Sequence, residues 1–349
     1  LSIDGSTISK VWSGAEVLTT GARNPEWMSN NGKVTKVVID ASFKKARPQS
    51  CYCWFQDLKQ CKTIEGIEYL NTSEVTNMQL MFYYCSSLTS LDLINFDTSN
   101  VANMEGMFMY CSKLTSLNLS NFDTSNVTYM QEMFRGCSSL TSLNLSNFVT
   151  SKVTHMFYMF DGCSKLESLD LSSFNTSEVE FAYSMFFRCS GLTTLTLGSF
   201  DMSKMESADL MFYGCSSLCL LDLSNVTKTE DVSKIIGKLP AESNPVIFIS
   251  KDIEKPATNK NIVTENATCE KFEIDANNIT KLSLPYSFTA NSVTFKRSFV
   301  AGKAHTICLP FELNTSATDD YKLYEYDAYE DGIVKFKDAP STTTPHKPY

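Results

Sequence analysis

Leucine and polar residues alternate in short segments that recur along the middle of the chain. In one such segment Leu114, Leu117, Leu119 and Phe122 form the pattern L-x-x-L-x-L-x-x-F. Side chains two residues apart in a strand point to the same face, so Leu117 and Leu119 are expected to share a buried side. The pattern predicts a short strand with one apolar and one polar face.

A second apolar pattern with a different period precedes each of these strands. Val101, Met104, Met107, Phe108 and Cys111 recur at steps of three and four residues, which is typical of the apolar stripe of a helix. The Asp-Thr-Ser-Asn run at residues 97–100 carries side chains that accept hydrogen bonds from the free N–H groups at a helix start. The predicted unit is therefore strand, turn, helix and loop.

The two patterns together repeat with a fixed period. Six cysteines are each 26 residues apart: Cys85, Cys111, Cys137, Cys163, Cys189 and Cys215. The unit Asn95–Ser120 returns almost letter for letter in Asn121–Ser146. A period in the twenties is the signature of a solenoid, in which stacked units bury each other's faces. The predicted fold is an α/β leucine-rich-repeat solenoid.

One unit cannot be stable alone. It offers roughly seven or eight apolar side chains, each contributing about 1.5–3 kcal/mol when fully buried. Ordering its backbone costs about 1–2 kcal/mol per residue. Because the cost exceeds the gain, neighbouring coils must cover each unit, and both ends of the array need caps.

The repeat decays on both sides, which suggests three regions. Residues 1–50 hold a strand-like Lys36–Asp40 segment with Trp12 and Trp27, and are predicted to cap the solenoid. Residues 51–250 form the solenoid, closing with a helix stop near Gly237 and a strand at 246–249.

The chain changes character after the solenoid. A polar linker at 251–261 leads to residues 262–349, where short alternating segments predict a C-terminal antiparallel β domain of sandwich-like type. The expected strands are 271–274, 292–295, 306–309 and 333–336. The chain starts at Leu1 without a leader, so we expect a mature or trimmed form with its export signal absent.

The repeat closely resembles that of a known family. The unit Asn-Phe-Asp-Thr-Ser-Asn-Val-Thr-x-Met-x-x-Met-Phe-x-x-Cys-Ser-x-Leu-Thr-Ser-Leu-x-Leu-Ser is similar to the repeat of BspA-like bacterial leucine-rich-repeat surface proteins, over about residues 51–235. The stretch 297–311 looks like a β module of secreted proteins of the same group. This resemblance implies an extracellular or surface-anchored protein that adheres to host matrix proteins or to other cells. It carries no shared binding motif.

Charge and hydropathy narrow the possible partners. The net charge of −9 and pI near 5.0 argue against a nucleic-acid binder, which needs a basic face to displace counterions from phosphates. Apolar runs are short, so no segment is expected to span a bilayer. The expected partner is a protein or glycan on host or neighbouring cells.

The cysteine ladder permits two interpretations. Adjacent strands lie about 4.7–4.9 Å apart, and a disulfide needs Cα atoms about 4.4–6.8 Å apart, so distance alone leaves pairing of neighbours open. Each cysteine closes an apolar stripe, however, where a free thiol behaves as a small hydrophobe. We favour unpaired, buried cysteines. The Cys51-Tyr52-Cys53 spacing is too short for an ordinary zinc knuckle, and no metal site is predicted.

Catalysis finds little support in the sequence. The histidines His155, His305 and His346 are far apart, and there is no nucleophile elbow, phosphate loop or metal-binding histidine pair. A carbohydrate-active enzyme would need paired carboxylates across a cleft, whereas the acidic residues of the repeats lie in rows. We expect no enzyme, no catalytic residue and no cofactor.

The two sides of the solenoid are expected to differ. The strand side presents a row of mostly polar residues: Ser90, Asp92, Ser116, Asn118, Ser142, Asn144, Ser168, Asp170, Thr194, Thr196, Leu220 and Asp222. This row could bind a cation or a glycan, but we favour a solvated, hydrogen-bonded ladder. The helix side varies between units and collects aromatic residues. The candidate partner-binding residues are Tyr129, Phe157, Tyr158, Phe181 and Tyr183. An exposed apolar patch indicates an interaction site, and the alternative is that these rings pack inward.

These observations favour a recognition or adhesion protein that uses the solenoid as a rigid platform. The alternative is a structural spacer of the cell surface whose C-terminal β domain makes the contacts.

Overall fold

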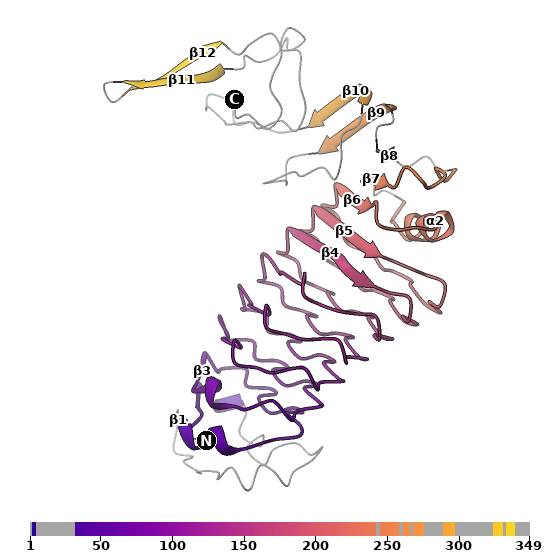
Figure 1. Ribbon diagram of the computed structural model, residues 1–349. Coiled ribbons are helices and arrows are strands. Elements are labelled where there is room, and N and C mark those ends of the chain that lie inside the picture. The colour runs from indigo at the N-terminus through magenta and orange to yellow at the C-terminus, as the bar shows by residue number, and fades with distance from the viewer. Residues whose placement is uncertain are drawn as a thin grey trace. The chain divides into compact units, whose positions relative to one another are not determined.

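The computed structural model describes residues 2–4, 32–241, 245–257, 261–265, 268–275, 289–296, 324–330 and 333–338. The chain divides into two compact units, one of residues 1–274 with 288–294, the other of residues 275–287 with 295–349. The first unit holds the repeat as a stack of coils, which Figure 1 shows side by side. The chain is a β-solenoid, as its 26-residue period predicts.

A small sheet precedes the regular coils. Strand β1 (Ser2–Asp4) pairs antiparallel with β2 (Lys36–Val38), which pairs parallel with β3 (Thr63–Glu65). Two short 3-10 helices, η2 (Ala41–Lys45) and η3 (Ile67–Tyr69), flank β3 in the chain. The strand predicted at Lys36–Asp40 is therefore confirmed over three residues. Trp12 and Trp27 lie outside the described residues.

The last coils form a five-stranded parallel sheet in sequence order. Its strands are β4 (Ser168–Asn175), β5 (Thr194–Ser199), β6 (Leu220–Leu223), β7 (Val246–Ile249) and β8 (Asn261–Thr264). The buried leucines are in register, with Leu169 opposite Leu195 and Leu195 opposite Leu221. Helix α2 (Thr229–Gly237) ends where a helix stop was predicted. Because β8 pairs with β7, the sheet extends past the boundary predicted at residue 262, and β7 does not close it.

The described residues after β8 include four more strands. Strands β9 (Thr268–Asp275) and β10 (Thr289–Lys296) form one two-stranded sheet. Strands β11 (Tyr324–Glu330) and β12 (Ile333–Asp338) form an antiparallel pair. The strand expected at 306–309 lies outside the described residues, so the C-terminal sandwich-like domain stays a prediction.

The helix predicted in each repeat is wrong. Over residues 101–111 alternate N–H groups leave the coil: Gly106 donates to the Gln131 carbonyl at 2.9 Å, and Phe108 to that of Met133 at 2.9 Å. The N–H groups between them close tight turns, as when Cys111 donates to the Phe108 carbonyl at 3.1 Å. Consecutive turns return a side chain to the core every three or four residues, which reproduces helical spacing without a helix. We call residues 101–111 and their equivalents the turn ribbons.

Each turn ribbon contains residues whose backbone is left-handed. Gly106 has φ 56° and Tyr110 φ 60°, and the same two places recur in the coils on either side. The third residue of a type II turn requires positive φ, which glycine adopts without steric cost. Glycine occupies one of these places in several coils, including Gly136, Gly162 and Gly214. A regular helix has no place for such residues.

The Asp-Thr-Ser-Asn runs join coils, and the prediction that they cap helices is wrong. Thr98 is buried, and its Oγ1 donates to the Asp123 carbonyl at 2.9 Å while accepting from the Asp123 N–H at 2.8 Å. Asn100 donates from Nδ2 to the Ser73 carbonyl in the preceding coil. Asp97 closes the local loop by accepting from the Ser99 N–H and hydroxyl. The buried hydroxyls form a threonine ladder: Thr72, Thr98, Thr124, Thr150 and Thr176.

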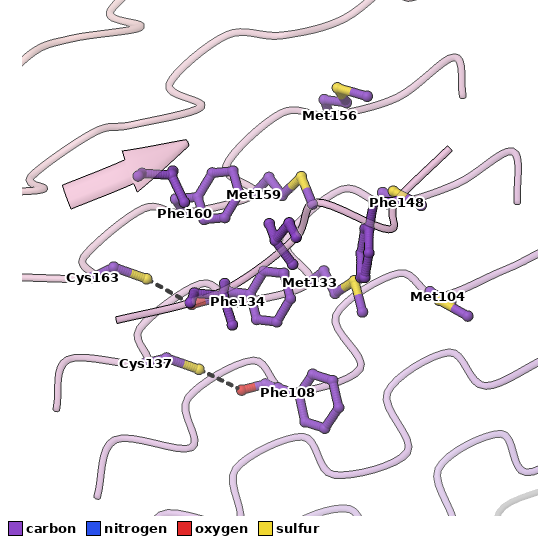
Figure 2. Close-up of a cluster of buried hydrophobic side chains, with 14 of the residues drawn as sticks. Met104, Phe108, Met133, Phe134, Cys137, Phe148, Met156, Met159, Phe160 and Cys163 are labelled. Carbon is purple, nitrogen blue, oxygen red and sulfur yellow. Dashed lines mark hydrogen bonds between the residues drawn. The ribbon is translucent and has the colours of Figure 1, made fainter. Parts of the chain in front are cut away.

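Aligned columns of identical residues fill the core. The rings of Phe108, Phe134 and Phe160 stack at 5.9 and 5.7 Å between centroids. Figure 2 shows this stack beside methionines and cysteines, with the Cys137 thiol donating to the Phe108 carbonyl at 3.1 Å. The six cysteines of the ladder are buried and unpaired, which confirms the prediction. Each donates to the carbonyl of a phenylalanine in the preceding coil.

Candidate recognition surface

The residue type differs from coil to coil at the outward positions of the turn ribbons. Parallel bridges join Asn103 to Tyr129, Tyr129 to His155 and His155 to Phe181, so the four residues lie in one row along the solenoid. Two residues further along each coil, Gln131, Phe157 and Tyr183 form a parallel row. Coil stacking thus brings residues 26 apart in sequence side by side.

The structure brings the five predicted aromatic residues into one connected cluster. Phe157 and Tyr183 stack with centroids 4.8 Å apart and planes 4° from parallel. Tyr158 meets Tyr183 edge to face at 5.3 Å. Tyr129 and Phe181 join through His155, whose ring lies 5.3 and 5.1 Å from theirs. We call Tyr129, Phe157, Tyr158, Phe181 and Tyr183 the aromatic surface.

These rings are neither fully buried nor free of neighbours. Tyr129 is 40% exposed, and the other four are half-buried. The five rings therefore lie at the surface, although much of each ring packs on another ring. Burial raises the pKa of the Tyr183 hydroxyl, with Tyr158 adding to the effect.

Arg135, which was not singled out from the sequence, contacts the aromatic surface at Tyr158. The Arg135 guanidinium lies 4.4 Å from the centre of the Tyr158 ring, a cation–π contact. It also pairs with Glu132 at 2.8 Å and with Asp161 at 2.9 Å. Burial raises the pKa of Asp161, and Arg135 opposes that rise. The only signal in the sequence was an arginine at a position that holds Met109 one coil earlier.

Further aromatic pairs lie at other positions of the turn ribbons, and in part on other coils. Tyr84 and Tyr110 lie 4.6 Å apart, and Arg135 reaches the Tyr110 ring at 5.8 Å. Closer to the C-terminus, Phe187 stacks on Tyr213 at 5.2 Å. Aromatic side chains therefore line the turn ribbons over several consecutive coils.

The strand side is a polar ladder that bonds to itself. Asn118 accepts from the Ser120 N–H at 3.1 Å, and Asp170 from that of Ser172 at 2.9 Å. Most of this row is exposed, as predicted, but Leu220 and Asp222 are buried, so that part of the prediction is wrong. One oxygen of each of these two side chains is therefore occupied within its own loop.

The described residues give no sign of a metal centre. No group of three His, Cys, Asp or Glu side chains within them is placed to hold an ion. His155 lies with Nδ1 2.7 Å from the Thr154 hydroxyl, and His305 and His346 lie outside the described residues. Among the described helices, none has the length and apolar character needed to cross a bilayer.

Comparison with known proteins finds a matching family model and a similar solved structure. A family model described as "Mycoplasma protein of unknown function, DUF285" matches residues 49–167 and again 116–226. A leucine-rich repeat protein from Bacteroides ovatus ATCC 8483 is similar at 15% identity and a TM-score of 0.18, over 74% of this chain and 84% of that one. No curated protein matches the chain.

Proposed function

The chain belongs to the family described as Mycoplasma protein of unknown function, DUF285, and from this premise we propose that it is a BspA-like recognition protein, secreted or held at the cell surface. Its task is to bind a macromolecule of a host or neighbouring cell, without catalysis. The aromatic surface is the proposed contact site. The observation that carries this proposal is the cluster of partly exposed rings across three adjacent coils.

The composition of the cluster suits an interface. Tyrosine, phenylalanine and arginine are enriched at protein contacts, because each buries a large area and the polar ends of tyrosine and arginine still form hydrogen bonds. Here Tyr158 and Tyr183 carry hydroxyls, and Arg135 lies against the Tyr158 ring. Such residues at neighbouring positions supply the anchors that the polar strand side lacks.

The coils supply a rigid support for these rings. Met156 donates to the Phe181 carbonyl at 2.8 Å and Tyr158 to that of Tyr183 at 3.1 Å, so the backbone beneath the cluster is bonded from coil to coil. The stacked core below holds the same positions from inside. A contact site whose geometry is already fixed loses less conformational entropy when a partner binds.

The test compares the full chain with a Phe157→Ser/Tyr183→Ser variant for binding to host matrix proteins, glycans and bacterial cell surfaces. We expect at least one partner to bind and the variant to lose about tenfold or more in affinity. The control is Ile94→Ser, which removes an apolar side chain that is more exposed, at 52%, and lies in a loop outside the aromatic surface. Circular dichroism checks that all three proteins are folded.

Undiminished binding by the variant would contradict the proposed site. Binding that survives the loss of both rings would favour the alternative, in which the solenoid is a spacer and the C-terminal region makes the contacts.

A further inference from the structure

We infer that the partner of the aromatic surface is a protein segment rich in apolar and basic side chains, and not a saccharide or a polyanion. This inference rests on the proposed function, whose site it takes as given. It follows from two observations, the orientation of the rings and the charge of the positions around them.

Two of the rings, those of Phe157 and Tyr183, stack on each other in parallel. Phe157 and Tyr183 occupy the same position of adjacent coils, and their 4.8 Å separation equals the usual spacing of neighbouring strands. The stack therefore runs along the solenoid, and each of the two rings covers a face of the other. Arg135 similarly covers a face of Tyr158.

This orientation determines what can pack on the surface. A saccharide packs its C–H groups against an open ring face, and three of the five rings have a face already occupied. Ring edges instead pack against aliphatic groups and against the faces of other aromatic rings. Those groups are the apolar side chains of a protein, so the stack favours a protein partner.

The positions around the rings are predominantly acidic. Carboxylates at outward positions of the turn ribbons or next to them are Glu105, Glu132, Asp161, Glu178, Glu180, Glu206 and Asp209, while the cationic groups there are those of Arg135, Lys152, Arg188 and Lys204. Arg135 pairs with two of the carboxylates, and Asp209 pairs with Lys238. Within the described part of the chain, Glu180 and Glu206 are exposed and have no ion-pair partner.

One side-chain acceptor beneath the rings is unpaired in the region that the structure describes. Gln131 lies in the same row as Phe157 and Tyr183, is 6% exposed, and its Oε1 has no hydrogen-bond partner among the described residues. A partner with lysine or arginine supplies both donors and positive charge. A polyanion such as nucleic acid or a sulfated glycan is repelled by the same carboxylates.

The experiment uses the full chain and four soluble probes, with binding measured at low and at physiological salt. The probes are a short peptide of alternating lysine and leucine or phenylalanine, its counterpart with glutamate for lysine, a neutral oligosaccharide, and heparin. We expect the lysine peptide alone to bind. Phe157→Ser and Tyr183→Ser should each weaken that binding about tenfold, and Ile94→Ser should leave it unchanged.

Charge variants test the second observation separately. A Glu180→Gln/Glu206→Gln variant should bind the lysine peptide several-fold more weakly at low salt, and nearly as well as the unaltered chain at high salt. Equal binding of this variant at low salt would overturn the assigned role of the acidic positions.

The outcomes separate this inference from the proposed function. If the oligosaccharide or heparin binds and the two ring variants abolish that binding, the aromatic surface is a recognition site but the inferred partner class is wrong. If the lysine peptide binds equally to the unaltered chain and to both ring variants, the aromatic surface is not the site, and the inference and the proposed site fall together.

Discussion

The threonine ladder allows a direct test of what joins successive coils. The change is Thr124→Val, which keeps the shape of the side chain and replaces its hydroxyl by a methyl group. Thr124 is 1% exposed, and its Oγ1 donates to the Val149 carbonyl at 2.9 Å and accepts from the Val149 N–H at 2.8 Å. The substitution therefore removes two hydrogen bonds to one residue of the next coil and leaves no cavity.

The magnitude follows from the two lost bonds. Each intramolecular hydrogen bond contributes about 0.5–1.5 kcal/mol, so the pair contributes about 1–3 kcal/mol to the free energy of unfolding. Thr124→Ser keeps the hydroxyl and loses one methyl group, which costs about 1 kcal/mol. Thr141→Val changes an exposed threonine and should alter stability by less than about 0.5 kcal/mol.

Two measurements check this prediction. Urea denaturation gives the change in unfolding free energy of each variant, and hydrogen exchange followed by mass spectrometry reports on the Val149 amide. Thr124→Val should speed exchange at Val149, whereas Thr124→Ser should not, because only the valine leaves that N–H without an acceptor. Wild-type stability together with unchanged exchange at Val149 in Thr124→Val would refute the reasoning, since the hydroxyls would then contribute nothing to coil stacking.

Three further changes test other parts of the fold. Gly136→Ala should destabilise the chain more than Gly162→Ala in thermal unfolding. Both glycines have positive φ, but a Cβ at 136 would lie 2.3 Å from the Tyr110 ring, whereas a Cβ at 162 would make only ordinary contacts. Equal losses of thermal stability in the two variants would contradict this prediction. Iodoacetamide should label half-buried Cys219 in the native protein and Cys137 only after unfolding, because burial raises the pKa of the Cys137 thiol well above its usual value. Equal labelling rates of the two cysteines in the native protein would argue against the buried ladder. Lys228→Met should raise the pKa of Asp201 from about 2 towards its ordinary value, as measured by carboxyl NMR, because a hydrogen bond from Lys228 is the main cause of the lowering. Because the pKa of Asp201 is lower in the folded chain, its carboxylate stabilises the fold above the ordinary pKa near 3.8, and this stabilisation is lost as the pH falls through about 2. The Lys228→Met variant lacks this contribution, so it should lose less stability than the unaltered chain on acidification over this range. An unchanged pKa would show that Lys228 does not act on Asp201.

The features set by the period were accessible from the sequence. Stacking places residue n beside residue n + 26, so the alignment of Leu169 with Leu195, the buried cysteines and the gathering of Phe157 with Tyr183 follow from spacing alone. These inferences need only the period and the inward or outward direction of each position.

The local backbone was harder to infer, because a helix and a row of tight turns give apolar residues the same spacing. The evidence against a helix was the glycine at 106, 136, 162 and 214, within or beside the apolar stripe of four of the six units. The ion-pair group of Arg135, Glu132 and Asp161 was missed for another reason. Its geometry depends on side-chain conformations between coils, which residue spacing does not specify.

The separation between inward and outward positions has a consequence for how such chains can change over generations. The inward residues pack against the neighbouring coils, and the buried threonines form hydrogen bonds to them. The outward positions of the turn ribbons vary from tyrosine to serine to aspartate without altering the backbone. Duplication or loss of DNA encoding one whole unit therefore leaves every remaining junction complete, whereas an insertion of a few codons does not. Copying a coil that carries rings, or deleting it, would enlarge or divide the proposed binding site in a single genetic event while the fold is inherited intact.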